Sequence, residues 1–164
     1  MRGTKRMHDN LLGQLNSAKC LYLRRLYEPK DNSLCIVVDE AVENRSGRLD
    51  VSLPDLENVS RGAYPIEPVE GCKTFELFWN AYIAYLVTEE MAGSTGNYSD
   101  EEYVGKLFRE YKRSHFLEYL SRDTGGHSQP VRHYKLTCLN HLIDVGSYTP
   151  PHVRTIPWRS DEVR

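Results

Sequence analysis

The sequence predicts an α+β fold: a mainly antiparallel sheet with a broken two-part helix packed on one face. Three observations support this fold class. Several runs are rich in β-branched and aromatic residues, one segment near residue 100 begins with helix-capping residues, and no β-α-β alternation recurs along the chain. The 164 residues are enough for one domain with a sizeable core.

The first element after an N-terminal arm or short helix (residues 1–19) is expected to be a β-hairpin. The runs CLYLRRLYE and SLCIVVDEAVE flank PKDN, whose residues favour a turn. If Glu28 faces Ser33, Cys20 and Cys35 lie about 20 Å apart along the strands, which predicts free thiols. The Pro- and Gly-rich stretch that follows permits only short edge strands around residues 49–53.

The segment TFELFWNAYIAYLVTEE, residues 74–90, fits the apolar period of a strand and also that of a helix. Its aromatic and β-branched residues favour a strand, and the exposed-helix formers Lys, Arg and Gln are absent from it. We therefore expect one long central strand over residues 73–88, with aromatic side chains on both faces.

A broken helix is expected over residues 100–121, covering one face of that strand. Ser99 and Glu102 form a capping box at its start. The apolar residues of the two halves fall on opposite sides of a helical wheel, which predicts a break and a second short helix capped by Ser114.

The last predicted strand covers residues 131–146. Its apolar residues change parity around Asn140 and His141 without a Gly or Pro turn, which indicates a bulge whose backbone these two side chains could bind. Residues 149–164 are rich in proline and are expected to form an extended tail, so residues 20–148 form the single α+β domain.

Composition and charge limit the kinds of partner that we expect. Apolar residues make up 40% and charged residues 27% of the chain, as in ordinary globular proteins. The chain lacks an apolar run of membrane-spanning length and a signal-peptide pattern, so we expect a soluble, cytoplasmic protein without a membrane partner. The net charge is −2 and the basic residues are dispersed, so no nucleic-acid partner is expected.

One group of residues suggests metal chemistry. His133, His141 and Asp144 lie in one segment and supply imidazole and carboxylate ligands for zinc or iron, with Asp39 or Glu40 added from the hairpin. A small metal-dependent hydrolase is therefore the alternative function. Sheet histidines are more often structural, and the sequence lacks a G-x-S-x-G motif, a P-loop and a C-x-x-C pair, so we assign no catalytic residue, metal or cofactor.

Tyrosine is the unusual feature of the composition, with eleven Tyr against four Phe and two Trp. A phenol combines apolar area with a polar tip and suits protein interfaces, although most tyrosines are expected to line the edge of the core. We therefore predict a non-enzymatic protein-binding module that neutralises or regulates a partner protein, and leave the oligomeric state open, homodimer included. The expected contact residues are Tyr22, Tyr82, Tyr85, Tyr98, Glu89 and Glu90.

Three segments carry a resemblance: TFELFWNAYIAYLVTEE, YVGKLFREYKRSHFLEYL and HYKLTCLNHLIDV. Over about residues 20–150 the chain resembles small bacterial proteins of unknown function at the level of pattern. The resemblance implies an α+β fold and a bacterial cytosolic setting, and it brings no catalytic residues with it.

Overall fold

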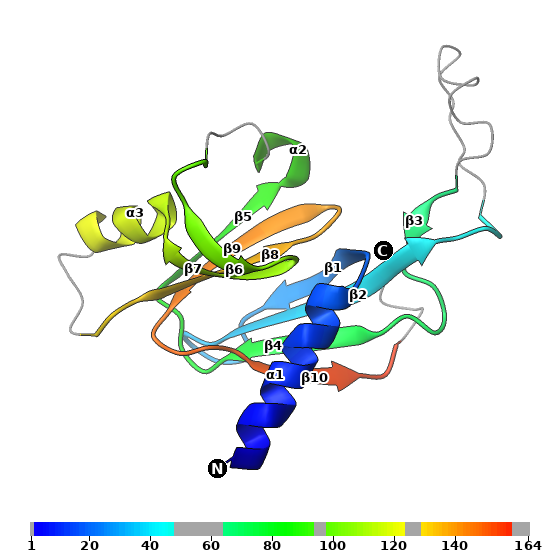
Figure 1. Cartoon of the computed structure of the whole chain (residues 1–164), viewed down its shortest axis with the longest axis horizontal. Coiled ribbons are helices and arrows are strands. Elements are labelled where there is room, and N and C mark those ends of the chain that lie inside the picture. Colours follow the sequence, from blue (N-terminus) through cyan, green and yellow to red (C-terminus); the bar gives the residue numbers. More distant parts are fainter. Residues whose placement is uncertain (1, 48–63, 94–97, 124–128, 159–164) are drawn as a thin grey trace.

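The computed structural model describes residues 2–47, 64–93, 98–123 and 129–158, which form two antiparallel sheets and three helices (Figure 1). The first sheet contains β1 (Cys20–Tyr27), β2 (Leu34–Glu43), β3 (Ile66–Glu67), β4 (Thr74–Trp79) and β10 (His152–Ile156). The second contains β5 (Ala84–Glu89), β6 (Glu102–Gly105), β7 (Phe108–Arg113), β8 (Arg132–Thr137) and β9 (His141–Ser147). The helices are α1 (Arg2–Ser17), α2 (Glu90–Gly93) and α3 (His115–Asp123).

Strand order fixes which side chains can meet. The first sheet runs β1-β2-β4-β10, with β3 paired to the end of β2, and the second runs β5-β9-β8-β7-β6. The described part of the chain is thus mainly β with some helix, as the predicted antiparallel sheet requires.

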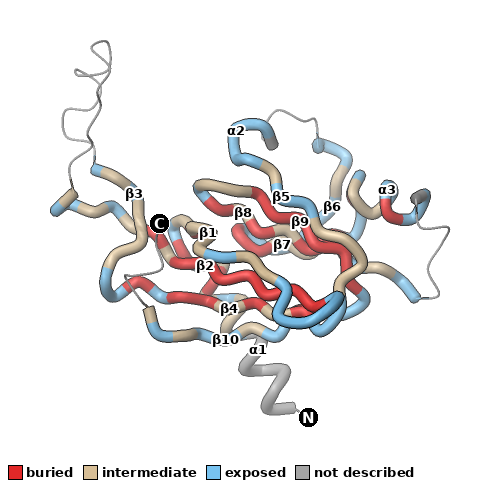
Figure 2. Tube along the Cα trace, turned by 180° about the vertical axis from the view of Figure 1, so that it is seen from behind, coloured by how far each residue is buried: buried red, intermediate tan, exposed pale blue. Residues whose placement is uncertain are grey.

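The core lies between the two sheets. Alternate residues of each central strand point inward, and the buried stretches concentrate in β2, β4, β8 and β9 (Figure 2). Trp79 of β4 and Tyr134 of β8 meet across the core with their ring centroids 6.1 Å apart. The other inward residues of these four strands are Leu34, Ile36, Val38, Phe75, Leu77, Leu136, Ile143 and Val145. Each fully buried side chain of this kind stabilises the fold by about 1.5–3 kcal/mol.

The C-terminal turn of α1 joins the N-terminal segment to the second sheet. Leu15 and Ala18 belong to the core. The side-chain Oδ1 of Asn16 accepts hydrogen bonds from three successive backbone N–H groups in the β6–β7 hairpin, those of Lys106, Leu107 and Phe108. Of the two expectations for residues 1–19, an arm or a short helix, the structure has the helix, which spans 16 residues.

The prediction of one long strand over residues 73–88 is wrong. The chain is extended, but it leaves the first sheet after Trp79 and enters the second at Ala84. The crossing is held by backbone hydrogen bonds from Tyr82 N–H to Asn32 O and from Ile83 N–H to Gly146 O. Because β4 and β5 lie in facing sheets, the aromatic residues of both strands can pack against the same core. A single long strand with aromatic residues on both faces would need a second layer to cover its other face.

The first half of the predicted broken helix is also wrong. Residues 102–113 form the hairpin β6–β7, turned at Gly105, whose φ of 98° is readily adopted by glycine. Asn16, far away in sequence, satisfies the N–H groups of that turn, and this contact outweighs the local capping signal at Ser99. The second half is confirmed: Ser114 Oγ accepts a hydrogen bond from Leu117 N–H at the start of α3.

The hairpin of β1 and β2 is confirmed, with one difference in register. Cys20 faces Ala41 as expected, but a bulge between Leu23 and Arg25 shifts the remaining pairs, so Cys35 faces Tyr27 instead of Leu26. All four cysteines are free, as predicted. The short strands expected around residues 49–53 lie outside the described residues.

The last predicted strand, 131–146, is two strands. β8 and β9 form an antiparallel hairpin, and the change of parity marks a reversal of the chain instead of a bulge. Asn140, in the turn, binds both the N–H and the C=O of Leu23 next to the β1 bulge. Within the segment expected to be an extended tail, β10 pairs with β4 at the edge of the first sheet.

Candidate functional site

The β8–β9 hairpin brings two of the three predicted metal-site residues together. His133 Nε2 lies 2.8 Å from Asp144 Oδ1, and His133 Nδ1 lies 2.8 Å from Ser114 Oγ. All three residues are buried. The ring of His133 also stacks on Tyr111, with centroids 4.2 Å apart, and contacts Phe116 of α3.

This network links α3 to the second sheet. Ser114 Oγ accepts the Leu117 N–H and also lies within hydrogen-bond distance of His133 Nδ1, while His133 Nε2 is hydrogen-bonded to Asp144 Oδ1. Both ring nitrogens are thereby engaged. Although Ser, His and Asp form one hydrogen-bonded chain, Ser114 serves as the N-cap of α3, and the chain fastens this helix to β8 and β9.

His141 does not join this pair. On β9, His141 shares a face with Ile143 and Val145, which point towards the first sheet, whereas Asp144 points to the opposite face. The residues that the structure describes contain no group of three His, Cys, Asp or Glu side chains placed to hold a metal ion. The alternative hydrolase stays a prediction.

The predicted additional ligand Asp39 lies in the other sheet, away from His133. Its carboxylate is fully buried and receives Arg24 Nε at 2.6 Å and the Thr74 hydroxyl at 2.6 Å. Arg24 is the extra residue of the β1 bulge, and its guanidinium forms a buried ion pair with Asp39. Glu40 approaches the backbone N–H of Lys73 at 3.4 Å.

A recess of about 260 Å³ opens on the outer face of the second sheet, beside the His133 network. Lys135 Nζ lies 3.3 Å from Asp144 Oδ1 at its floor and 5.7 Å from the centre of the Tyr98 ring. A neighbouring recess of about 280 Å³ shares Tyr98 and Lys135 and reaches Glu90. Two of the six predicted contact residues, Tyr98 and Glu90, therefore line one surface.

Tyr85 and Glu89 lie on β5, next to that surface, and Tyr82 lies just before it. The rings of Tyr82 and Tyr85 meet edge to face with centroids 5.1 Å apart, and both are half-buried against the core. The Tyr82 hydroxyl donates to Glu28 at 2.7 Å, and this hydrogen bond raises the pKa of Tyr82 to about 12. Tyr22 lies on β1 in the other sheet and is not part of the group.

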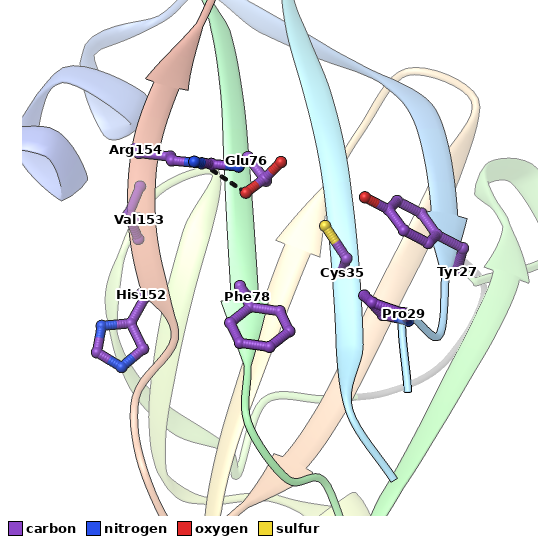
Figure 3. A pocket seen from close by; sticks show the side chains of 8 residues that line it. All are labelled: Tyr27, Pro29, Cys35, Glu76, Phe78, His152, Val153 and Arg154. Carbon is purple, nitrogen blue, oxygen red and sulfur yellow. Dashed lines mark hydrogen bonds and ion pairs between the residues drawn. The ribbon is translucent and has the colours of Figure 1, made fainter. Parts of the chain in front are cut away.

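The largest of these recesses, about 440 Å³, lies on the outer face of the first sheet, and no pattern in the sequence indicated it (Figure 3). Its wall contains side chains from β1, β2, β4 and β10. In Figure 3 the Tyr27 hydroxyl points towards Cys35, and Arg154 reaches across to Glu76. The cross-strand pairing of the whole sheet is needed to bring these residues together.

Comparisons with protein-family models, with curated proteins and with solved structures found no match to this chain. Among the described helices, none combines the length and the apolar character that crossing a membrane would require.

Proposed function

We propose that this protein is a protein-binding module that takes up an extended segment of its partner along the edge strand β5. Among the described residues, β5 pairs with β9 on one side only. An edge strand leaves a row of backbone N–H and C=O groups without strand partners, which another chain can pair with by adding a strand. The observation that supports the proposal is that β5 lacks the features that usually prevent such pairing.

The strands β1, β10 and β6, which end the two sheets elsewhere in the described chain, carry such features, and β3 is only two residues long. β1 contains a bulge together with Arg24 and Arg25, and β10 contains Arg154 between Pro151 and Pro157. β6 is only four residues long, has a shift of register after Glu102 and ends at Gly105. Bulges, positive charges, prolines and short length are the devices by which natural sheets avoid edge-to-edge association.

By contrast, β5 is six residues long, pairs with β9 without a shift of register, and contains no Pro, Lys or Arg. Leu86 and Val87 are 51% and 39% exposed on adjacent positions, and Met91 of the following helix is 73% exposed. Exposed apolar side chains on a regular edge without positive charges favour binding of another strand.

The surroundings of β5 indicate what the partner contributes. A strand added to this edge would project alternate side chains over Leu86 and Thr88, which border the 260 Å³ recess. Glu89 and Glu90 at the end of β5 favour a basic residue in the partner. The partner segment is therefore extended, apolar at alternate positions and basic at one end, and its capture would neutralise a partner that needs this segment free.

The test uses a displayed library of random peptides, selected on the full chain. Peptides that bind are expected to be rich in β-branched residues. Val87→Lys adds the kind of charge that protects natural sheet edges, and it should lower the affinity for the selected peptides about tenfold or more. Val104→Lys is the matched control, because Val104 is 57% exposed on the opposite edge strand β6. The proposal fails if no peptide is selected, or if the two variants bind the selected peptides equally well.

A further inference from the structure

The outer face of the first sheet carries two rows of side chains that cross all four of its main strands. Residues that pair directly across neighbouring strands form the first row, which contains Tyr27, Cys35, Phe78 and His152. The next row on the same face is Arg25, Val37, Glu76 and Arg154. The first row is dominated by rings, and the second has a guanidinium at each end.

The first row lines the recess of about 440 Å³, a size typical of small-molecule sites (Figure 3). The rings of Tyr27 and Phe78 are half-buried, and Cys35 lies at the floor with 2% exposure. A hydrogen bond to Cys35 raises the pKa of Tyr27, and burial raises the pKa of the Cys35 thiol. Both groups thus stay protonated and uncharged at neutral pH, so this row offers apolar ring faces and no negative charge.

The second row supplies positive charge beside these rings. The Arg154 side chain is 69% exposed and the Glu76 side chain 14% exposed, and Arg154 Nε lies 2.6 Å from Glu76 Oε1. Arg25 lies over the Tyr27 ring, 4.7 Å from its centre. Two guanidinium groups and one carboxylate leave this row with an excess of one positive charge, and the NH groups of exposed Arg154 can bind an anion while its Nε stays on Glu76.

We propose that this recess binds a small ligand made of a planar ring and an anionic group. The ring would stack against Phe78 and Tyr27, and the anion would bind Arg154, with Arg25 adding attraction from the far end of the row. A nucleoside phosphate and an aromatic carboxylate share this chemistry. The site is separate from β5, which belongs to the other sheet, so the inference does not depend on the proposed function.

Two probes distinguish the two sources of such a ligand: adenosine monophosphate and indole-3-acetate. Each would be titrated into the isotope-labelled full chain while backbone amide shifts are followed by NMR. We expect saturable shifts centred on Cys35, Phe78 and His152 with at least one probe, and the probe that binds more tightly identifies the source. Adenosine and indole, which lack the anion, should bind about tenfold more weakly or worse. Saturable shifts with neither probe at millimolar concentration would overturn the proposal.

Two substitutions in the ion pair should act in opposite directions. Arg154→Gln removes the anion's partner and should weaken binding about tenfold, whereas Glu76→Gln removes a competing carboxylate and should tighten binding about threefold. Arg109→Gln is the control, because Arg109 lies on the second sheet and should leave the affinity unchanged. Phe78→Leu keeps the apolar volume but removes the ring, and should weaken binding severalfold. Weaker binding in Glu76→Gln, or equal binding in Arg154→Gln, would refute the assignment.

Discussion

Replacing Asn16 by alanine removes one oxygen that accepts three backbone hydrogen bonds. Asn16 Oδ1 lies 2.9 Å from Lys106 N, 2.8 Å from Leu107 N and 2.9 Å from Phe108 N. These N–H groups follow the Gly105 turn between β6 and β7, and Asn16 Oδ1 is the acceptor of all three. The side chain of α1 therefore completes a hairpin that is about 90 residues away in sequence.

The cost follows from burial. Leu107 and Phe108 are 8% and 4% exposed, whereas Lys106 is exposed and its N–H can turn to water. A buried N–H that loses its partner costs about 1–3 kcal/mol. Two such groups give an expected loss of about 3 kcal/mol for Asn16→Ala. At a urea m-value of about 2 kcal/mol/M, the unfolding midpoint should fall by about 1.5 M.

Asn16→Asp is the matched control, since aspartate keeps the accepting oxygen. Its carboxylate makes stronger hydrogen bonds to N–H groups, and its charge near the C-terminus of α1 costs up to about 1 kcal/mol. We expect its free energy of unfolding to lie within about 1 kcal/mol of the wild-type value. The reasoning is refuted if urea unfolding finds Asn16→Ala as stable as the wild type, or finds the two variants equally destabilised.

Two further predictions concern packing and pH. A Cβ at Gly146 would lie 2.4 Å from Leu120 Cδ1, the flexible end of a buried side chain, so Leu120 must leave its rotamer and Gly146→Ala should cost about 0.5–1.5 kcal/mol in urea unfolding. Gly13→Ala in α1, whose added Cβ would have nothing within 4 Å, should stabilise by about 0.5–1 kcal/mol, and equal stabilities of the two variants would contradict this. The Asp100–His115 pair raises the pKa of His115 above 6.5 and lowers that of Asp100 below 3.8. The stability that His115 contributes is complete below pH 6.5 and is lost as the pH rises through its raised pKa. The stability that Asp100 contributes is complete above pH 3.8 and is lost as the pH falls through its lowered pKa. An NMR titration in which the Asp100→Asn substitution fails to return the His115 pKa towards 6.5 would contradict this pairing.

Elements whose signals are local were predicted from the sequence. The β1–β2 hairpin needs only its two strand-forming runs and the PKDN turn, where Asn32 adopts a φ of 60° that asparagine tolerates. The cap of α3 at Ser114 is likewise local, because the hydroxyl binds the N–H three residues ahead. Such features follow from neighbouring residues alone, whatever the rest of the chain does.

The errors arose where distant residues decide the structure. The bulge in β1 depends on Arg24 meeting Asp39 and on Asn140 binding the backbone of Leu23, contacts that span 15 and 117 residues. The hairpin β6–β7 depends on Asn16. A local pattern contains no information on these partners, so the capping residues at 99 and 102 led to the prediction of a helix where a hairpin forms.

The parity change in residues 131–146 was a usable signal that was misinterpreted. In the β8–β9 hairpin, paired positions such as Tyr134 and Val145 sum to an odd number. Residues on one face of the hairpin therefore have even numbers in one strand and odd numbers in the other. In a single strand, the same change would require a bulge. Recognising a hairpin would have placed His133 beside Asp144 and His141 on the other side, so the sequence pattern alone could have separated the predicted metal ligands.

The two proposed surfaces make independent demands on the same fold. The contact across β5 needs backbone groups at the edge of the second sheet, whereas the ligand recess needs side chains on the outer face of the first. Trp79 and Tyr134 link the sheets through a packed apolar core, which couples their stability but supplies no charge to either surface. Val87→Lys should therefore leave probe affinity unchanged, and Glu76→Gln should leave peptide affinity unchanged. If one variant alters both affinities, its substitution acts through the stability of the whole fold. The change in affinity is then evidence for neither site.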